Sequence, residues 1–386
     1  MSAKSRTISF WLTCLLAGLL PGCSHTSAKS VGSWDPKAAA SYLDRREAWW
    51  MQWPVAARDH QTFCVSCHTA LPYALSRPVL RKVLAEQSPT PEERLLLENV
   101  TKRVRLGKEV GPYYSDQQHG ANKTAESRGT EAVLNALILA SHDSQTGKLS
   151  DDTRAAFEDM WASQVTSGDQ KGAWSWLQFN LKPWEAASSD YYGAVLAAVA
   201  VGTAPHGYGS LPDSQDNLNR LREYLTRDYQ NRPLVDRIGL LWASAKLPGL
   251  LDQKQQSAII RSVLSAQQSD GGWCLSSLSR NWGPGGLRSY ARSWIRVDGT
   301  FVDRKSDGFA TGYALFALQQ VGVPRDTPEL QRGLTWLMEN QNKTEGLWRT
   351  YSLNEKRDPS SNVGQFMSDA ATAYAVLALA PRPGQH

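Results

Sequence analysis

The chain has 386 residues, of which 41% are hydrophobic and 20% are charged. This balance excludes a disordered chain and a multi-span membrane protein, and it predicts a globular protein with a large core. Lysine and arginine (42) exceed aspartate and glutamate (37) by only 5, so the composition does not favour binding of nucleic acid.

Residues 1–23 have the pattern of an export signal. A basic start precedes an apolar run from Ile8 to Leu20, which is too short to span a bilayer. The run leads to Cys23 in a pattern that resembles a bacterial lipobox. We expect lipidation of Cys23, a tether at 24–33, and a place on the periplasmic side of the cell envelope, with membrane contact through the anchor only. Plain secretion is the alternative.

Cys64 and Cys67 begin a Cys-x-x-Cys-His pattern that ends at His68. This pattern is typical of c-type haem attachment, in which the two thiols bond one porphyrin and the adjacent imidazole binds the iron. We therefore expect covalent haem c on Cys64 and Cys67, with His68 as an iron ligand. Two other interpretations stay open, a local Cys64–Cys67 disulfide and a zinc site completed by Cys274.

A sixth iron ligand is harder to place. No methionine occurs between Met51 and Met160, so the His/Met ligation of many cytochromes has no local donor. His60 and His119 are the nearby candidates, and the alternative is iron with five ligands.

A helix pattern rich in small apolar residues recurs along the chain. The clearest copies, 306–318 and 367–379, share Thr-x-Tyr-Ala-x-x-Ala-Leu in register, and weaker copies begin at Gly129, Ser189 and Asp236. Each copy is apolar nearly all round, as expected of a helix that is buried on most sides. Amphipathic helices are expected between the copies, at 153–164, 216–229, 253–268 and 330–341.

This alternation of buried and half-exposed helices predicts an all-α fold, an α/α toroid of about six helical hairpins in a ring. Residues 123–381 would form most of this single large domain. The preceding residues 34–122, which hold the Cys-x-x-Cys-His pattern, would be either the first hairpin of the ring or a small cytochrome-like module.

Three segments pair a glutamine with a later tryptophan. Arg332 to Gln341 is followed by Gly346-Leu347-Trp348, Gln268 leads to Trp273, and Gln164 leads to Trp174 in a degenerate copy. These segments resemble the Gln-Trp repeats of the squalene–hopene and oxidosqualene cyclase family, over about Arg128 to Pro381. The resemblance implies the α/α toroid of terpene cyclases and prenyltransferases.

The resemblance does not imply conventional cyclisation. Members of that family start cyclisation with an Asp-x-Asp-Asp-Thr-Ala motif, and the matching stretch here, from Asp307 to Gly312, keeps only the first aspartate. Asp307 is nevertheless the candidate catalytic residue of this chain.

The inner helices of an α/α barrel run parallel, so their amino ends share one rim. That rim would carry Glu131, Asp190, Asp236, Asp307 and Asp369, and His68 would lie on it too. Such acids are commonly helix caps. Two long connections, 275–305 and 349–367, belong to the same rim. They would serve as a lid, as contacts to haem propionates or as a docking site, and the alternative is a solvated, poorly ordered excursion.

The leading hypothesis is an exported, haem-c-binding toroid that transfers electrons with a redox partner protein or performs redox chemistry on an apolar small molecule. The first alternative is a haem-free toroid that binds or isomerises a terpenoid or a glycan through Asp307 and the rim aromatics. The second is a structural envelope protein with a Cys64–Cys67 disulfide.

Overall fold

The structure is a computed structural model that describes residues 33–280 and 293–381. The regular structure in these residues is helical apart from one antiparallel ribbon, in which β1 (Ala57–Arg58) pairs with β2 (Thr62–Phe63). The chain from Gly32 to His386 forms one compact unit. Its hydrophobic core begins at Ala39 and ends at Leu379, so the core is complete within this unit. The predicted all-α class is confirmed.

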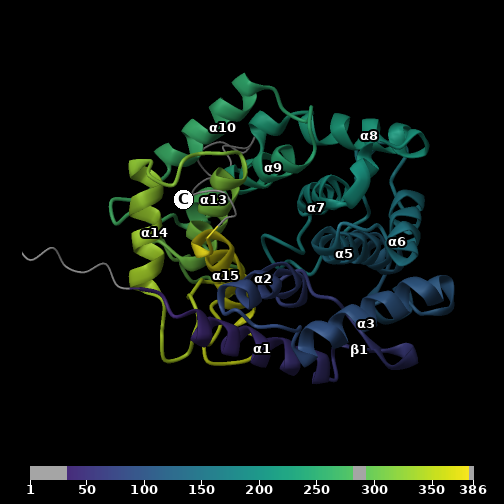
Figure 1. Cartoon of the computed structure of the whole chain (residues 1–386), viewed down its shortest axis with the longest axis horizontal. Coiled ribbons are helices and arrows are strands. Elements are labelled where there is room, and N and C mark those ends of the chain that lie inside the picture. Colours follow the sequence, from purple (N-terminus) through teal and green to yellow (C-terminus); the bar gives the residue numbers. More distant parts are fainter. Residues whose placement is uncertain (1–32, 281–292, 382–386) are drawn as a thin grey trace, which may run out of the picture. The chain divides into compact units, whose positions relative to one another are not determined.

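Six helices of the described residues form an inner ring, in which each packs against the next (Figure 1). They are α2 (Ala70–Val83), α5 (Lys123–Thr146), α7 (Asp190–Thr203), α9 (Leu234–Lys246), α13 (Gly308–Gln320) and α15 (Phe366–Leu379). The ring closes because α15 packs against α2. This arrangement is the α/α toroid that the helix repeats predict.

An outer helix precedes each inner helix in the chain and lies at the periphery of the ring (Figure 1). These helices are α1 (Pro36–Gln52), α3 (Pro91–Leu106), α6 (Asp151–Ala162), α8 (Gln215–Thr226), α10 (Gln253–Ser265) and α14 (Pro328–Asn340). The connections contain the short helices α4 (Asp116–His119) and α11 (Leu275–Leu278), and 3₁₀ turns at Asp59–Gln61, Gly107–Glu109, Pro205–Ser210, Pro212–Ser214 and Tyr229–Asn231. Within residues 33–280 and 293–381, no helix is both long and apolar enough to cross a bilayer.

Side-chain caps begin four of the outer helices, α1, α3, α6 and α10, and α3 shows the fullest set of local signals. At the start of α3, Thr90 accepts a hydrogen bond from the Glu93 amide while the Glu93 carboxylate accepts one from the Thr90 amide. This capping box satisfies two amide groups that the helix itself leaves unpaired. Pro91 then occupies the first helical turn, and Gly107 follows the helix with a φ of 55°.

The three Gln-Trp repeats join neighbouring outer helices through one shared geometry. The glutamine amide donates to a carbonyl at the amino end of the next outer helix, and the indole donates to the carbonyl four residues before the glutamine. The glutamine bonds run from Gln164 to Asn217 (3.0 Å), from Gln267 to Glu329 (2.7 Å) and from Gln341 to Asp35 (2.9 Å). The indole bonds run from Trp174 to Met160, from Trp273 to Val263 and from Trp348 to Leu337, each at 2.7 Å.

One detail differs from the sequence interpretation. In the second repeat the bridging residue is Gln267 and not Gln268, because the Gln268 amide donates instead to the Arg304 carbonyl at 3.1 Å. The bond from Gln341 to Asp35 links the last outer helix to the first, so the repeats also close the outer layer.

Glu47 is a buried acid on α1. Its side chain is fully covered, and neither carboxyl oxygen has a hydrogen-bond partner among the described residues. Burial, with the nearby Asp369 and Glu92 carboxylates, raises the pKa of Glu47 to about 8. The carboxyl is therefore neutral at pH 7 and ionises only in mild alkali.

This burial makes folding stability depend on pH. We expect the free energy of unfolding to fall between about pH 4.5 and 8, because unfolded Glu47 ionises near its ordinary pKa of 4.5 while the folded carboxyl keeps its proton. Glu47→Gln should remove this contribution, on the order of a few kcal/mol, and flatten the dependence. Urea denaturation over this pH range measures it, with the exposed Glu98→Gln as the charge control. Equal pH slopes in the wild type and Glu47→Gln would contradict the buried neutral carboxyl.

Candidate functional site

A cavity of about 570 Å³ opens at the carboxyl ends of the inner helices. All six inner helices contribute residues to its wall, so their carboxyl ends lie together and their amino ends form a rim on the other side, here called the amino rim. The apolar part of the lining consists of Ala74, Leu75, Pro78, Val79, Val83, Val199, Trp242, Phe316, Leu377, Ala380 and Pro381. The lumen of the ring is thus accessible from the carboxyl end.

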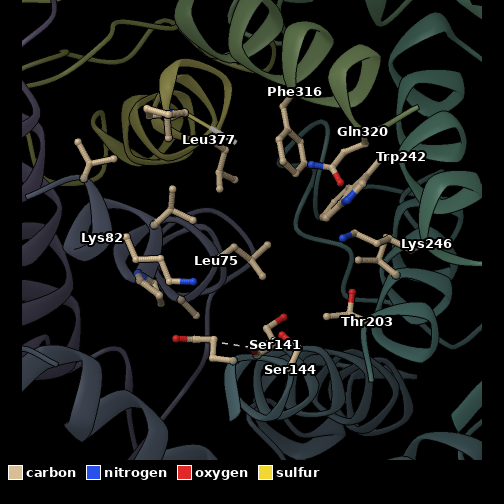
Figure 2. Close-up of a pocket in the computed structure, with 18 residues that line it drawn as sticks. Leu75, Lys82, Ser141, Ser144, Thr203, Trp242, Lys246, Phe316, Gln320 and Leu377 are labelled. Carbon is tan, nitrogen blue, oxygen red and sulfur yellow. Dashed lines mark hydrogen bonds between the residues drawn. The ribbon is translucent and has the colours of Figure 1, made fainter. Parts of the chain in front are cut away.

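The polar part of the cavity lining is sparse. Lys82 and Lys246 lie on opposite walls, and both ammonium groups are directed into the cavity (Figure 2). The remaining polar lining residues are Ser141, Ser144, Gln145, Thr203 and Gln320. Because each lysine belongs to the last turn of its helix, the ammonium groups also offset the partial negative charge of the helix carboxyl ends.

Asp307, the candidate catalytic residue, lies on the amino rim as the N-cap of α13. Its carboxylate accepts hydrogen bonds from the Ala310 amide at 2.9 Å, the Leu275 amide at 2.6 Å and the Thr350 hydroxyl at 2.9 Å. Burial raises the pKa of Asp307 to about 6, although these bonds oppose the shift. The contacts give Asp307 a structural role that joins α13 to two rim connections.

Three other rim acids also have specific partners. Glu131 accepts from Arg103 at 2.5 Å, and Asp190 accepts from the Tyr224 hydroxyl at 2.6 Å. Asp369 accepts two bonds from Arg46 (2.8 and 3.0 Å), one from the Tyr42 hydroxyl (2.6 Å) and one from the Thr69 hydroxyl (2.7 Å). These carboxylates therefore join neighbouring elements.

Asp236 is the rim acid that faces a pocket. Its neighbours there are aromatic and aliphatic, and burial raises its pKa to about 7. The other residues of this pocket are Pro183, Trp184, Tyr191, Tyr192, Val195, Val235, Gly239, Phe309 and Tyr313. The pocket has a volume of only about 10 Å³, which is enough for one water molecule. The amino rim is thus filled by side chains at this point.

Cys64, Cys67 and His68 are buried between β2 and α2, with 3%, 0% and 3% of their surface exposed. Both cysteines are free thiols. Burial raises the pKa of Cys64 to about 12, and the Cys67 thiol donates a hydrogen bond to the Glu185 carboxylate. Burial also raises the pKa of Glu185 to about 7, so this pair shares a region of low polarity.

Aromatic rings surround His68. Its imidazole stacks on Phe366 with ring centroids 3.9 Å apart, and it meets Trp50 edge-on at 5.3 Å and Trp184 at 6.1 Å. Its Nδ1 lies 2.9 Å from the Thr69 hydroxyl, and burial lowers the pKa of His68 to about 3. A porphyrin bonded to Cys64 and Cys67 would have to occupy the space that these rings fill, so the residues present do not fit haem.

The other candidate ligands lie elsewhere. His60 is exposed in the β1–β2 turn, where its Nδ1 lies 3.2 Å from Asp59. His119 is exposed on α4 and contacts the rings of Tyr114 and Phe179. No hydrogen bond or ring contact joins either histidine to His68 within the described parts of the chain. Cys274 is buried with its Sγ 3.2 Å from the Ser276 hydroxyl.

No protein-family model matches the chain, and no curated protein matches it. Solved structures similar to this chain include a glycosidase described as wild type and two described as single-residue variants of a glycosidase. Each shows 12% sequence identity, and each alignment covers 89% of this chain and 96% of the other. The TM-scores are 0.44 for the wild type and 0.48 and 0.46 for the variants, a level of similarity from which we draw no conclusion about activity.

The expected haem-iron electron-transfer function is wrong. No group of three or more His, Cys, Asp or Glu side chains in residues 33–280 and 293–381 is arranged to hold a metal ion. The aromatic packing around His68 gives the physical reason, because the side chains of the Cys-x-x-Cys-His pattern are used in the core.

Asp307 provides a direct test of the structural role of the rim acids. We expect Asp307→Ala to lower the free energy of unfolding by about 2–4 kcal/mol, because the cap of α13 and two further bonds are lost. Asp307→Asn should cost less, since asparagine is also a good N-cap. Chemical denaturation measures both variants, and unchanged stability in Asp307→Ala would contradict the structural assignment.

Proposed function

We propose that this chain is a haem-free ring that binds an apolar small molecule of the terpenoid class in the cavity at the carboxyl ends of the inner helices. The observation that carries the proposal is the cavity itself, with a volume of about 570 Å³ and a lining that is mostly aliphatic and aromatic. Pockets that hold small molecules commonly measure about 300–1,000 Å³ and combine apolar walls with a few polar groups. This cavity matches both criteria.

The lining also supports a particular type of ligand. Aliphatic residues such as Leu75, Val79 and Leu377 offer contact to a hydrocarbon body, and burial of that body provides the main free energy of binding. Lys82 and Lys246 supply hydrogen-bond donors for one polar end of the ligand. An amphipathic molecule with a branched hydrocarbon body suits this distribution.

The groups in the cavity support binding more than catalysis. Hydrolysis of a glycoside commonly uses a pair of carboxyl groups, and protonation of an alkene needs a strong acid. The described lining holds ammonium, amide, hydroxyl and apolar groups and no carboxyl group. Asp307, Glu131, Asp190 and Asp369 lie toward the amino rim instead, and each accepts hydrogen bonds from groups of the protein.

The Gln-Trp repeats support a second proposal, that this chain is related to the squalene cyclases. Their shared bonds between outer helices agree with a ring of the squalene-cyclase type. We also propose that the protein is exported and anchored through Cys23, on the signal pattern alone; this residue lies outside the described residues.

A binding experiment with a blocked cavity tests the proposed function. Isothermal titration with geranylgeraniol should show saturable binding to the wild type. Ser141→Trp, which adds a large ring at the cavity wall, should weaken the affinity at least about tenfold, or about 1.4 kcal/mol. His142→Trp changes the adjacent, exposed residue of α5 outside this cavity and serves as the matched control.

The outcomes are distinct. Loss of binding in Ser141→Trp alone supports the cavity as the terpenoid site. Absence of binding to the wild type, or equal affinity in both variants, would refute it. A parallel titration with cellotetraose tests the glycan alternative, and cavity-dependent binding of this sugar in place of geranylgeraniol would overturn the terpenoid assignment.

A further inference from the structure

The connection between α11 and α13 contains a short β-hairpin on the amino rim. Ile295 and Phe301 form an antiparallel bridge. The Arg296 amide donates to the Thr300 carbonyl at 2.8 Å, and the Val302 amide donates to the Trp294 carbonyl at 3.0 Å. The expected long rim connection therefore forms a hairpin within residues 293–305, while residues 281–292 lie outside the described residues.

The outer face of this hairpin is apolar, although a strand face that meets solvent is usually polar. Successive strand residues point to opposite faces, and the apolar face normally meets the core. Here Ile295, Val297 and Phe301 are 45%, 68% and 75% exposed, whereas Arg296 and Val302 are each only 6% exposed. Ile295 and Phe301 are cross-strand partners and Val297 follows Ile295 by two residues, so the three apolar side chains share the outer face.

Buried polar contacts hold the hairpin in this orientation. The Arg296 guanidinium donates to the Ser352 carbonyl at 2.7 Å and to the Asp303 carboxylate at 2.6 Å, and it also contacts the Phe301 carbonyl. The Val297 amide donates to the Asn354 carbonyl at 2.9 Å. A rotation that buried the apolar face would break these bonds and expose the paired arginine. These contacts therefore keep the apolar side chains on the exposed face of the hairpin.

Basic residues flank the apolar face. Arg304 and Lys305 are exposed, and they lie over the rings of Trp294 and Tyr351 at 4.2 and 4.5 Å. Two acids lie nearby. Asp303 pairs with Arg296, and Asp298 in the turn is exposed and accepts hydrogen bonds from the Thr300 hydroxyl and the backbone amide of the exposed Lys356. An apolar face with aromatic and basic neighbours is complementary to a surface that has acyl chains below negative headgroups.

The place where the N-terminal stretch enters the fold supports the same partner. Trp34 contacts Trp348 with ring centroids 6.2 Å apart, and the connection that follows Trp348 supplies the Ser352 and Asn354 carbonyls to the hairpin. The expected lipidation site, Cys23, precedes Ser33 by about ten residues, a length that spans at most about 35 Å. The chain thus enters the compact unit beside the connection that holds the hairpin.

We propose that the outer face of this hairpin, formed by Ile295, Val297 and Phe301, binds the surface of an anionic lipid bilayer. This contact goes beyond the expected membrane contact through a lipid anchor. It does not depend on the proposed ligand, because the hairpin precedes the amino end of α13 whereas the cavity opens at the carboxyl end of the ring.

Vesicle co-sedimentation tests this proposal. The compact unit Gly32–His386, which contains the whole described core, is used so that neither the signal segment nor an attached lipid contributes. It should bind vesicles of phosphatidylglycerol and phosphatidylethanolamine, and bind phosphatidylcholine vesicles more weakly. The double variant Val297→Ser/Phe301→Ser should reduce the partition coefficient at least about tenfold, since partition follows the apolar area that enters the interface.

The controls separate the hairpin from general hydrophobicity and from misfolding. Leu95→Ser removes a comparably exposed (51%) apolar residue from α3 and should leave vesicle binding unchanged. Phe301→Ser alone should have an intermediate effect, and thermal unfolding verifies that each variant folds. The proposal would be overturned if the wild type did not bind vesicles, or if the hairpin and Leu95 variants lost vesicle binding equally. It would also be overturned if the wild type were a dimer that the hairpin substitutions dissociate, because the face would then bind a second copy of the chain.

Discussion

Closure of the ring depends on the buried ion pair between Arg46 and Asp369. Arg46 belongs to the first outer helix and Asp369 to the last inner helix, and both side chains are nearly inaccessible to water. The same carboxylate accepts from Tyr42 and from Thr69 at the start of α2, so one group joins the two ends of the chain's circular path. Removal of one partner from such a pair leaves a buried charge uncompensated, at a cost of about 3–5 kcal/mol. Both the cavity and the amino rim require this closure, because each is formed by helices from the whole ring.

The two ends of the ring differ because their connections differ in length. Between most outer helices and their inner helices the chain uses long segments, such as 163–189 and 341–365, and the connection from α8 to α9 at 227–233 is the short exception. Between an inner helix and the next outer helix it uses short ones, such as 247–252 and 321–327. Long connections bring aromatic residues into the amino end, where Trp184 packs against Phe309. The short connections leave the carboxyl end open, and this asymmetry places the cavity there.

The fold could be predicted from the sequence, whereas the surroundings of the candidate site residues could not. Helices that are apolar all round can only be buried, so their recurrence predicted the inner ring correctly. The Cys-x-x-Cys-His pattern specifies only the spacing of two thiols and an imidazole along the chain. It does not predict which side chains surround them, and in the structure Phe366 and Trp50 pack against His68. The acids on the rim were recognised, but their partners were not. Glu185 belongs to no motif, and Lys82 and Lys246 are separated by 164 positions in the sequence, so only the closed ring brings both to one cavity.

The two proposals together constrain the ligand more than either does alone. If the hairpin lies on a bilayer, the cavity at the opposite end of the inner helices faces water, and a ligand must cross water to reach it. Transfer of a bare hydrocarbon into water costs about 25 cal/mol for each Å² of exposed surface, so a long, purely apolar molecule would reach the cavity slowly from solution. A polar end lowers that cost and finds donors in Lys82 and Lys246 on the cavity walls. The geometry therefore favours an amphipathic terpenoid, such as an alcohol or an acid, over a hydrocarbon of the same length.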